Sequence, residues 1–193
     1  MFHDWKSAVA AFALMATPAL AAQDTLTLGM VLEPPSLDPT GNAAAAIDEV
    51  VYANIFEGLT KFGPDGSIQP ALASSWDVAD DGKTYIFHLH EGVKFHDGAD
   101  FTAEDGVFSL DRARAADSTN PQKTLFENIE SVEAVDPKTL RVTLKAADGM
   151  FPFKMAWGDA VMLDPASIAD EATKPIGTGP FKFTEWKLSL IHI

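Results

Sequence analysis

The sequence predicts an α+β fold, and three observations support this expectation. Short segments in which apolar and polar residues alternate occur in pairs, and turn residues join the members of each pair, as in β-hairpins. Helical patterns lie between these pairs without the regular strand–helix–strand period of a doubly wound sheet. The 193 residues are 47% apolar and 22% charged, a composition that suits one globular domain, or two small ones, with a sizeable core.

The charge and the missing residue types exclude several classes of function. Lys and Arg number 14 against 28 Asp and Glu, which gives a formal net charge of −14. A chain with this charge repels phosphate backbones, so we expect no nucleic-acid partner. The sequence has no cysteine, which excludes thiol catalysis, disulfide bonds and thiolate metal sites. It also lacks the glycine-rich nucleotide motifs and the Gly-x-Ser-x-Gly element of serine hydrolases, and we expect no cofactor.

Residues 1–21 have the three-part pattern of a secretory signal peptide. Lys6 provides a short basic start, Ala8–Met15 is an unbroken apolar run, and small residues precede a cleavage point after Ala21. The alternative is a buried N-terminal helix, whereas a membrane span would need about 20 apolar residues. We therefore expect export and a periplasmic location for the mature chain.

The mature chain is expected to begin with a strand, a rigid loop and a helix. Residues Thr25–Val31 alternate like a strand, and the prolines of Glu33–Pro39 stop it. Apolar residues at helical spacing predict a helix over Asn42–Glu57, with Gly58 near its end as a C-cap. A turn at residues 63–66 should then join two short strands.

Two β-hairpins are the clearest local predictions. In the first, Ser75–Leu89, apolar residues alternate on both sides of an Asp-Asp-Gly turn, whose residues tolerate a positive φ. Its register predicts that Trp76 and Phe87 pack together in the hairpin core. In the second, Phe126–Val135 and Leu140–Leu144 form the two strands around an Asp-Pro turn.

The remaining elements are shorter. A strand is expected at Val93–Phe95 and a helix at about 102–116, with Thr102 as N-cap and Asp105 completing a capping box. The apolar segment Met150–Met162 is helix-like but is broken by its proline. The last expected elements are a short helix at Pro165–Ala172, a turn at Gly177–Pro180 and a strand at Phe181–Trp186.

Three groups of residues have alternative interpretations. His88 and His90 point to one strand face and, with His96, could bind a metal, or they lie on a solvated hairpin face. Glu104 and Asp105 could act as acid and base, but adjacent helical residues diverge, and the helix dipole already explains acidic residues in a first turn. The tryptophans could stack on a ligand, although we expect each of them in the core: Trp76, Trp157 and Trp186.

Several motifs occur in an order that resembles one known family. They are Ala71–Trp76, Asp80–Leu89, Glu91–Gly98, Phe101–Asp105 and Phe108–Leu110 with Arg112, flanked by Glu33–Pro39 and Gly177–Phe181. Together they resemble the signature of the family 5 solute-binding proteins, the extracytoplasmic receptors of the peptide, dipeptide and nickel type that serve ABC importers. The resemblance covers about Leu26–Trp186.

The resemblance implies a two-lobed fold like that of the type II periplasmic binding proteins, and a receptor rather than an enzyme. Residues 22–187 would be the N-terminal part of the family domain, namely part of lobe I with the extra hairpin-containing subdomain at about 41–164. Residues 188–193 depart from the family pattern, so we expect a truncated chain with a foreign tail. The implied partners are a peptide or another small solute and an ABC permease, and the full-length protein would be a monomer without a metal site.

The resemblance also suggests which residues face a ligand cleft. The candidates lie in two loops, and they are Glu33, Ser36, Asp38, Gly177, Thr178 and Gly179. The alternative is loop architecture alone, since prolines stiffen the first loop and glycines permit the tight turn of the second. A nickel or metallophore receptor is a further reading within the family if His88 and His90 bind metal. A secreted hydrolase is the alternative from another class.

Two residues depart from the family pattern. His90 stands where arginine is usual, which removes a fixed charge from the end of the hairpin. Gly106 stands where an apolar helix residue is usual, and we expect it to cost about 1 kcal/mol of helix stability.

Overall fold

A computed structural model describes residues 25–187. The expected signal peptide at residues 1–21 and the tail at 188–193 lie outside the described residues. The chain divides into two compact units between Val31 and Leu32. No helix within residues 25–187 is long and apolar enough to cross a membrane.

The described part of the first unit, residues 25–31, contains no strand, so the strand expected at Thr25–Val31 is wrong. Its apolar side chains are exposed, at 80% for Leu26, 75% for Leu28 and 99% for Val31. Alternation makes a segment suitable for a sheet, but a strand forms only where a neighbouring strand takes up its hydrogen bonds. The pattern therefore identified a segment compatible with β structure and not a strand.

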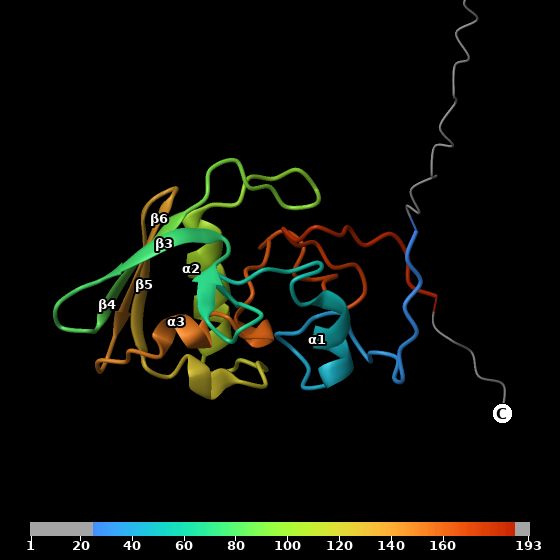
Figure 1. The fold of residues 1–193 in the computed structure, drawn as a ribbon, viewed down its shortest axis with the longest axis horizontal. Coiled ribbons are helices and arrows are strands. Elements are labelled where there is room, and N and C mark those ends of the chain that lie inside the picture. Colours follow the sequence, from blue (N-terminus) through green and yellow to red (C-terminus); the bar gives the residue numbers. More distant parts are fainter. Residues whose placement is uncertain (1–24, 188–193) are drawn as a thin grey trace, which may run out of the picture. The chain divides into compact units, whose positions relative to one another are not determined.

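The second unit mixes helices and strands, as the α+β prediction requires (Figure 1). Its helices are α1 (Ala45–Val51), α2 (Ala103–Arg114) and α3 (Phe151–Lys154), with 3-10 turns at Lys123–Leu125 and Gly158–Ala160. Its strands are β1 (Thr60–Phe62), β2 (Ile68–Pro70), β3 (Ala73–Val78), β4 (Thr84–Leu89), β5 (Ile129–Asp136) and β6 (Thr139–Leu144). The first two strands form a small sheet, and the others form an antiparallel sheet in the order β3-β4-β6-β5.

Both predicted hairpins are present, and β4 pairs with β6 to join them into one sheet. The first hairpin turns at Gly82, whose φ is +65°, a conformation that glycine adopts without strain. The second hairpin begins at Ile129 rather than at Phe126. Helix α2 packs against β5 and β6. The local pairing therefore follows the sequence closely, with small shifts at strand ends.

Strand alternation decides which side chains of this sheet reach the core. Tyr85, Phe87 and Leu89 of β4 are buried, and the ring of Phe151 from α3 lies 5.1 Å from that of Tyr85 and 6.2 Å from that of Phe87. Trp76 pairs with Phe87 across the hairpin, with 6.4 Å between ring centroids, so the predicted contact is confirmed. Trp76 is only half-buried because β3 is an edge strand.

Trp76→Ala should lower the free energy of unfolding by about 2 kcal/mol, less than the 3–5 kcal/mol that a fully buried aromatic residue costs. The reason is that the indole packs on Phe87 but also meets solvent. Urea denaturation checks this value. Val78→Ala on the same strand, where Val78 is 47% exposed, is the matched control and should change stability by less than about 0.5 kcal/mol. Equal losses for the two variants would contradict packing of Trp76 on the core.

The first turn of α2 has the predicted capping box. Asp105 Oδ2 accepts hydrogen bonds from the Thr102 amide at 2.8 Å and from the Thr102 hydroxyl at 3.0 Å. The helix ends at Arg114, slightly earlier than expected. A Cβ on Gly106 would lie 2.9 Å from Leu140 Cδ2, so glycine lets α2 approach β6 closely. The loss of helix stability expected at Gly106 therefore occurs at a position where the helix and the sheet are in close contact.

The predicted length of α1 is wrong, because the helix ends at Val51. Tyr52 leaves it with an extended backbone, and Ala53 adopts a φ of +56°, which residues other than glycine rarely take. Gly58 is not a C-cap but forms an isolated bridge with Val161. Apolar residues continue at helical spacing past the helix end because the following turn buries them as well.

Two helix predictions in the C-terminal half are also wrong. α3 occupies only a small part of Met150–Met162, and Pro152 lies in its first turn, where a missing amide costs nothing, rather than breaking a helix. Residues Pro165–Ala172 form successive turns, in which amides bond to carbonyls three residues back. Such bonds close single turns and do not extend an α-helix.

Two expected strands are absent from the described residues. Phe181–Trp186 has no strand, and Val93–Phe95 contributes only one isolated bridge. Both segments bond to loops instead. The amide of Phe181 donates to the Asn54 carbonyl at 2.9 Å, for example.

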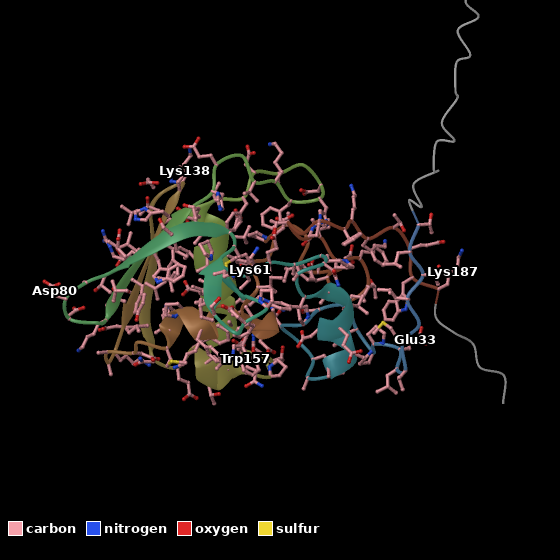
Figure 2. The ribbon with its side chains drawn as sticks, in the orientation of Figure 1. Glu33, Lys61, Asp80, Lys138, Trp157 and Lys187 are labelled. Carbon is pink, nitrogen blue, oxygen red and sulfur yellow. The ribbon has the colours of Figure 1, made fainter. Side chains whose placement is uncertain are left out.

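Trp157 is 38% exposed (Figure 2), so the core position expected for this residue is wrong.

Candidate functional site

Buried apolar residues form two clusters, and the first candidate loop is anchored in the smaller one. The larger cluster includes Phe87, Leu110 and Leu140, from β4, α2 and β6. Leu37, in the middle of the first loop, belongs to the smaller cluster, and Trp186 packs at its margin. The smaller cluster consists of Leu37, Ile47, Val51, Ile55, Phe56, Val161 and Leu163.

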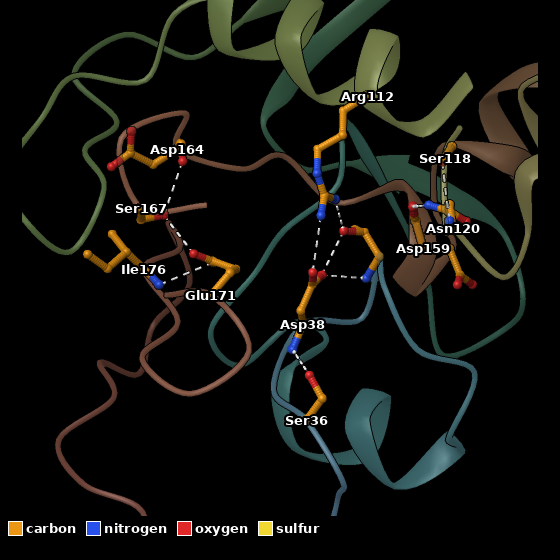
Figure 3. Close-up of polar contacts among 11 residues, drawn as sticks. Ser36, Asp38, Arg112, Ser118, Asn120, Asp159, Asp164, Ser167, Glu171 and Ile176 are labelled. Atoms are coloured by element: carbon orange, nitrogen blue, oxygen red, sulfur yellow. Dashed lines mark hydrogen bonds and ion pairs between the residues drawn. The ribbon is translucent and has the colours of Figure 1, made fainter. Parts of the chain in front are cut away.

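Asp38 is buried, and both of its carboxylate oxygens are bound within the protein (Figure 3). Oδ1 accepts hydrogen bonds from the Thr40 amide at 2.8 Å and from the Thr40 hydroxyl at 2.6 Å. Oδ2 pairs with Nη2 of Arg112, from α2, at 3.2 Å. Nη1 of Arg112 also bonds to the Thr40 hydroxyl. This ion pair ties the first loop to α2.

The other two candidates in the first loop are more accessible. Ser36 is half-buried, and its hydroxyl oxygen accepts a hydrogen bond from the Asp38 amide at 3.1 Å. Glu33 is exposed (Figure 2), and its Oε1 accepts a hydrogen bond from Trp186 Nε1 at 3.3 Å. The Glu33 carboxylate is therefore at the surface, whereas the Asp38 carboxylate is buried and paired with Arg112.

The second candidate loop is held against the protein by close backbone contacts. A Cβ on Gly177 would lie 1.9 Å from the Ile55 carbonyl oxygen, and one on Gly179 would lie 2.4 Å from the Asn54 carbonyl oxygen. The Gly179 amide donates to the Ile55 carbonyl at 2.8 Å. Both positions require glycine because this turn lies directly on the segment that follows α1.

Two side chains complete the attachment of this turn. The Thr178 hydroxyl donates to Glu57 Oε2 at 3.0 Å. His96 Nε2 lies 2.8 Å from the Gly179 carbonyl oxygen, and the His96 amide donates to the Gly177 carbonyl at 2.9 Å. A hydrogen on Nε2 satisfies the Gly179 carbonyl and leaves Nδ1 as an acceptor for the Gly177 amide, which is 3.4 Å away. The polar groups of the turn are therefore largely used inside the protein.

Several buried carboxyl groups lie near these loops, and burial raises their pKa values. Glu171 is fully buried, and burial, with the nearby charges of Asp38 and Asp164, raises its pKa to about 7. Burial also raises the pKa of Asp164. For Asp159, burial and the charge of Asp48 raise the pKa to about 6. These groups therefore hold protons more tightly than ordinary carboxyls do.

No pattern in the sequence predicted a structural role for Arg112 or Glu171, and His96 was expected only in a turn or at a metal. Arg112 lies between the buried residues Leu110 and Ala113 of α2, where a charged side chain needs a partner. That position was the available signal for a buried acidic residue elsewhere in the chain.

The histidines of the first hairpin do not form a metal site with the described residues. His88 Nε2 lies 2.8 Å from Asp77 Oδ2, and both side chains are well exposed. His90 is exposed at the end of β4. No group of three or more His, Cys, Asp or Glu within residues 25–187 could hold a metal ion.

Comparisons with known proteins agree with the motif resemblance. Residues 67–191 match the family described as bacterial extracellular solute-binding proteins, family 5 Middle. Glutathione-binding protein GsiB of Pectobacterium atrosepticum is 37% identical over 179 residues, which are 90% of this chain and 34% of that protein. The protein of the same name from Escherichia coli K12 is 34% identical over 180 residues, 91% of this chain and 35% of that protein. The chain thus spans about a third of the length of the curated relatives it matches.

Solved structures show the same fold. AgaA from A. tumefaciens R10 in complex with agropinic acid has a TM-score of 0.75 at 32% identity, covering 80% of this chain and 32% of that one. NikZ from Campylobacter jejuni in complex with Ni(L-His) has a TM-score of 0.71 at 31% identity, covering 81% and 32%. The periplasmic binding protein DppA from Helicobacter pylori in complex with peptide STSA has a TM-score of 0.70 at 30% identity, covering 79% and 35%. The expected periplasmic-binding-protein fold is therefore confirmed, and because the family match covers more than half of the chain, the protein belongs to the bacterial extracellular solute-binding proteins of family 5.

Proposed function

We propose that this chain is part of an extracytoplasmic receptor that binds a small peptide and delivers it to an ABC permease. The observation that carries the proposal is the match of residues 67–191 to a family of solute-binding proteins. The glutathione-binding relatives and the structure with peptide STSA favour a peptide as the solute. Because the matched family is described by its binding of solutes, we also favour a receptor over an enzyme.

In this proposal the two candidate loops form part of a preformed ligand surface. The pair of Asp38 with Arg112 fixes the first loop, and the close contacts of Gly177 and Gly179 fix the second. Fixed loops lose little conformational entropy when a ligand binds. Glu33 is then the direct contact, because its exposed carboxylate accepts hydrogen bonds from ammonium or amide groups.

The cellular setting belongs to the same proposal. Residues 1–21 are removed on export, and the mature protein works in the periplasm as a monomer without a cofactor. Ligand binding shifts an equilibrium between open and closed forms, and permease subunits in the inner membrane recognise the closed form.

A chelated metal is the second candidate solute. The structure of NikZ in complex with Ni(L-His) matches this chain at a TM-score of 0.71 and 31% identity. Binding of Ni(L-His) in place of peptide would favour this candidate, and His88 and His90 would then be tested as ligands by substitution with alanine.

The 193-residue chain by itself should show no saturable binding of glutathione or of di- to pentapeptides at micromolar concentration. A ligand pocket buries most of a small solute, and we expect a chain that spans about a third of its relatives to supply only one wall. Isothermal titration with glutathione, a peptide library and Ni(L-His) checks this. Saturable micromolar binding to the chain alone would contradict the expectation that it supplies only one wall of the ligand pocket.

A chimera tests the receptor role in the same experiment. In it, the part of the Pectobacterium glutathione-binding protein that this chain does not match follows Lys187. The chimera should bind glutathione saturably and return it intact, as mass spectrometry of the ligand would show. Hydrolysis of the ligand would instead identify an enzyme, and the absence of binding to every probe would count against the proposed function.

A further inference from the structure

We propose that Glu171 is a positioning residue whose neutral side chain holds the two candidate ligand loops in place. The inference rests on the proposed function only for the statement that these loops meet a ligand. Their attachment through the segment around Glu171 is a property of the chain itself (Figure 3).

The segment around Glu171 bonds to both loops. Glu171 Oε1 accepts a hydrogen bond from the Ile176 amide at 3.3 Å, directly before Gly177 in the second loop. The carbonyl of Ala172 accepts a hydrogen bond from the amide of Leu37 at 2.9 Å, in the middle of the first loop. A change at Glu171 therefore reaches both loops through one or two hydrogen bonds.

A neutral Glu171 carboxyl group allows the largest number of hydrogen bonds around Ser167. Ser167 Oγ lies 2.6 Å from Glu171 Oε2 and 3.1 Å from the Asp164 carbonyl oxygen. A hydroxyl has one proton to donate, so an ionised Glu171 takes that proton and leaves the Asp164 carbonyl with the Ser167 amide, 3.1 Å away, as its donor. A protonated Glu171 donates from Oε2 to Ser167, and Ser167 then donates to the Asp164 carbonyl.

The charges that face Glu171 also favour the neutral form. Glu171 is 0% exposed, and the charged groups that act on it are Asp38, from the first loop, and Asp164, from the preceding turn. Arg112, a cation of α2, is paired with Asp38. Ionisation would place a third negative charge at a buried position, which is costly unless the segment opens to water. Burial and these carboxylates together raise the pKa of Glu171 to about 7.

The attachment of the loops should therefore weaken as the pH rises. The pKa of Glu171 is about 7 when its side chain is buried, against an ordinary value of 4.5. Between these pH values the state with Glu171 buried therefore binds more protons than a locally opened state in which Glu171 meets water. The stability that the neutral carboxyl adds to the buried state is fully present below pH 4.5 and is lost as the pH rises from there to the pKa of buried Glu171. Both loops are then held more firmly at acid pH than at alkaline pH.

Amide hydrogen exchange of the 193-residue chain, corrected for the intrinsic exchange rate at each pH, tests this. The protection of the Ile176 and Leu37 amides should fall about tenfold between pH 6 and pH 8, as the two pKa values require. Glu171→Gln should abolish this pH dependence, because glutamine donates to Ser167 and accepts from Ile176 at every pH. Glu49→Gln, at an exposed position of α1, is the matched control and should keep it.

Three results would overturn the proposal. The first is that the tenfold fall persists in Glu171→Gln. The second is that the amides of β4 and β6 lose protection equally, since that is global destabilisation and not loosening of the loops. The third needs no variant: carbon-13 NMR titration of the Glu171 carboxyl should give a midpoint near 7, and a midpoint below about 5 refutes the neutral side chain. Failure of the chimera to bind any ligand, with normal exchange behaviour, would count against the proposed function and leave this inference intact.

Discussion

Gly177→Ala should lower the free energy of unfolding by about 3 kcal/mol, the upper end of the usual cost of overpacking. A Cβ at this position would lie 1.9 Å from the Ile55 carbonyl oxygen and 2.7 Å from the Ile55 carbonyl carbon. These are backbone atoms, so they cannot rotate away as a side chain can. The turn would have to lift from the segment after α1, which would break the hydrogen bond from Gly179 to Ile55 and admit water beside Phe56.

Gly149→Ala is the matched control for this change. A Cβ on Gly149 would have no neighbouring atom within 4 Å, so the substitution should change stability by less than about 0.5 kcal/mol. Urea denaturation of the two variants and the native chain gives the comparison. A loss at Gly177 no greater than that at Gly149 would mean that the turn does not lie on the Ile55 backbone.

The hairpins and the start of α2 could be predicted because the information for them is local. The first hairpin depends on alternating residues within β3 and β4 and on Gly82, which reverses the chain with a φ of +65°. The start of α2 depends on Thr102 and Asp105, which bond to each other within one turn. Patterns that span a few residues are sufficient to specify such contacts.

The ends of elements that depend on distant partners could not be predicted in this way. Thr25–Val31 and Phe181–Trp186 alternate as well as the hairpin strands do, but a strand requires a partner, and alternation does not say whether one exists. The end of α1 is decided similarly. The Tyr52 hydroxyl donates to the Ala156 carbonyl, a contact across the fold that no periodicity reveals.

The candidate site shows the same difference between local and long-range information. The sequence identified both loops, but it could not identify what holds them. Asp38 and Arg112 are 74 positions apart, and His96 and Gly179 are 83 positions apart. A motif marks Asp38 as special without distinguishing contact with a ligand from a buried ion pair, and only the position of Arg112 in the fold makes that distinction.

Arg112→Met should be the other large loss, about 3 kcal/mol, because it leaves Asp38 buried without its cation. The side chain of Asp38 is 12% exposed and that of Arg112 is 29% exposed, so the charge left behind is the more deeply buried of the two. Methionine preserves most of the apolar stem of arginine, which keeps stem packing out of the measured difference. The loss therefore reports the guanidinium contacts with Asp38 and Thr40.

Two further variants make this measurement decisive. Arg141→Met removes a surface ion pair in which Arg141 Nη1 lies 3.1 Å from Glu133 Oε2, with side chains 40% and 53% exposed. This change should lower the free energy of unfolding by less than about 1 kcal/mol. Adding Asp38→Asn to Arg112→Met should recover part of the loss, because no buried charge then remains. Urea denaturation of the native chain and these three variants gives the four values. If Arg112→Met costs no more than Arg141→Met, the ion pair does not anchor the first loop, and the Asp38 carboxylate is then free to contact a ligand.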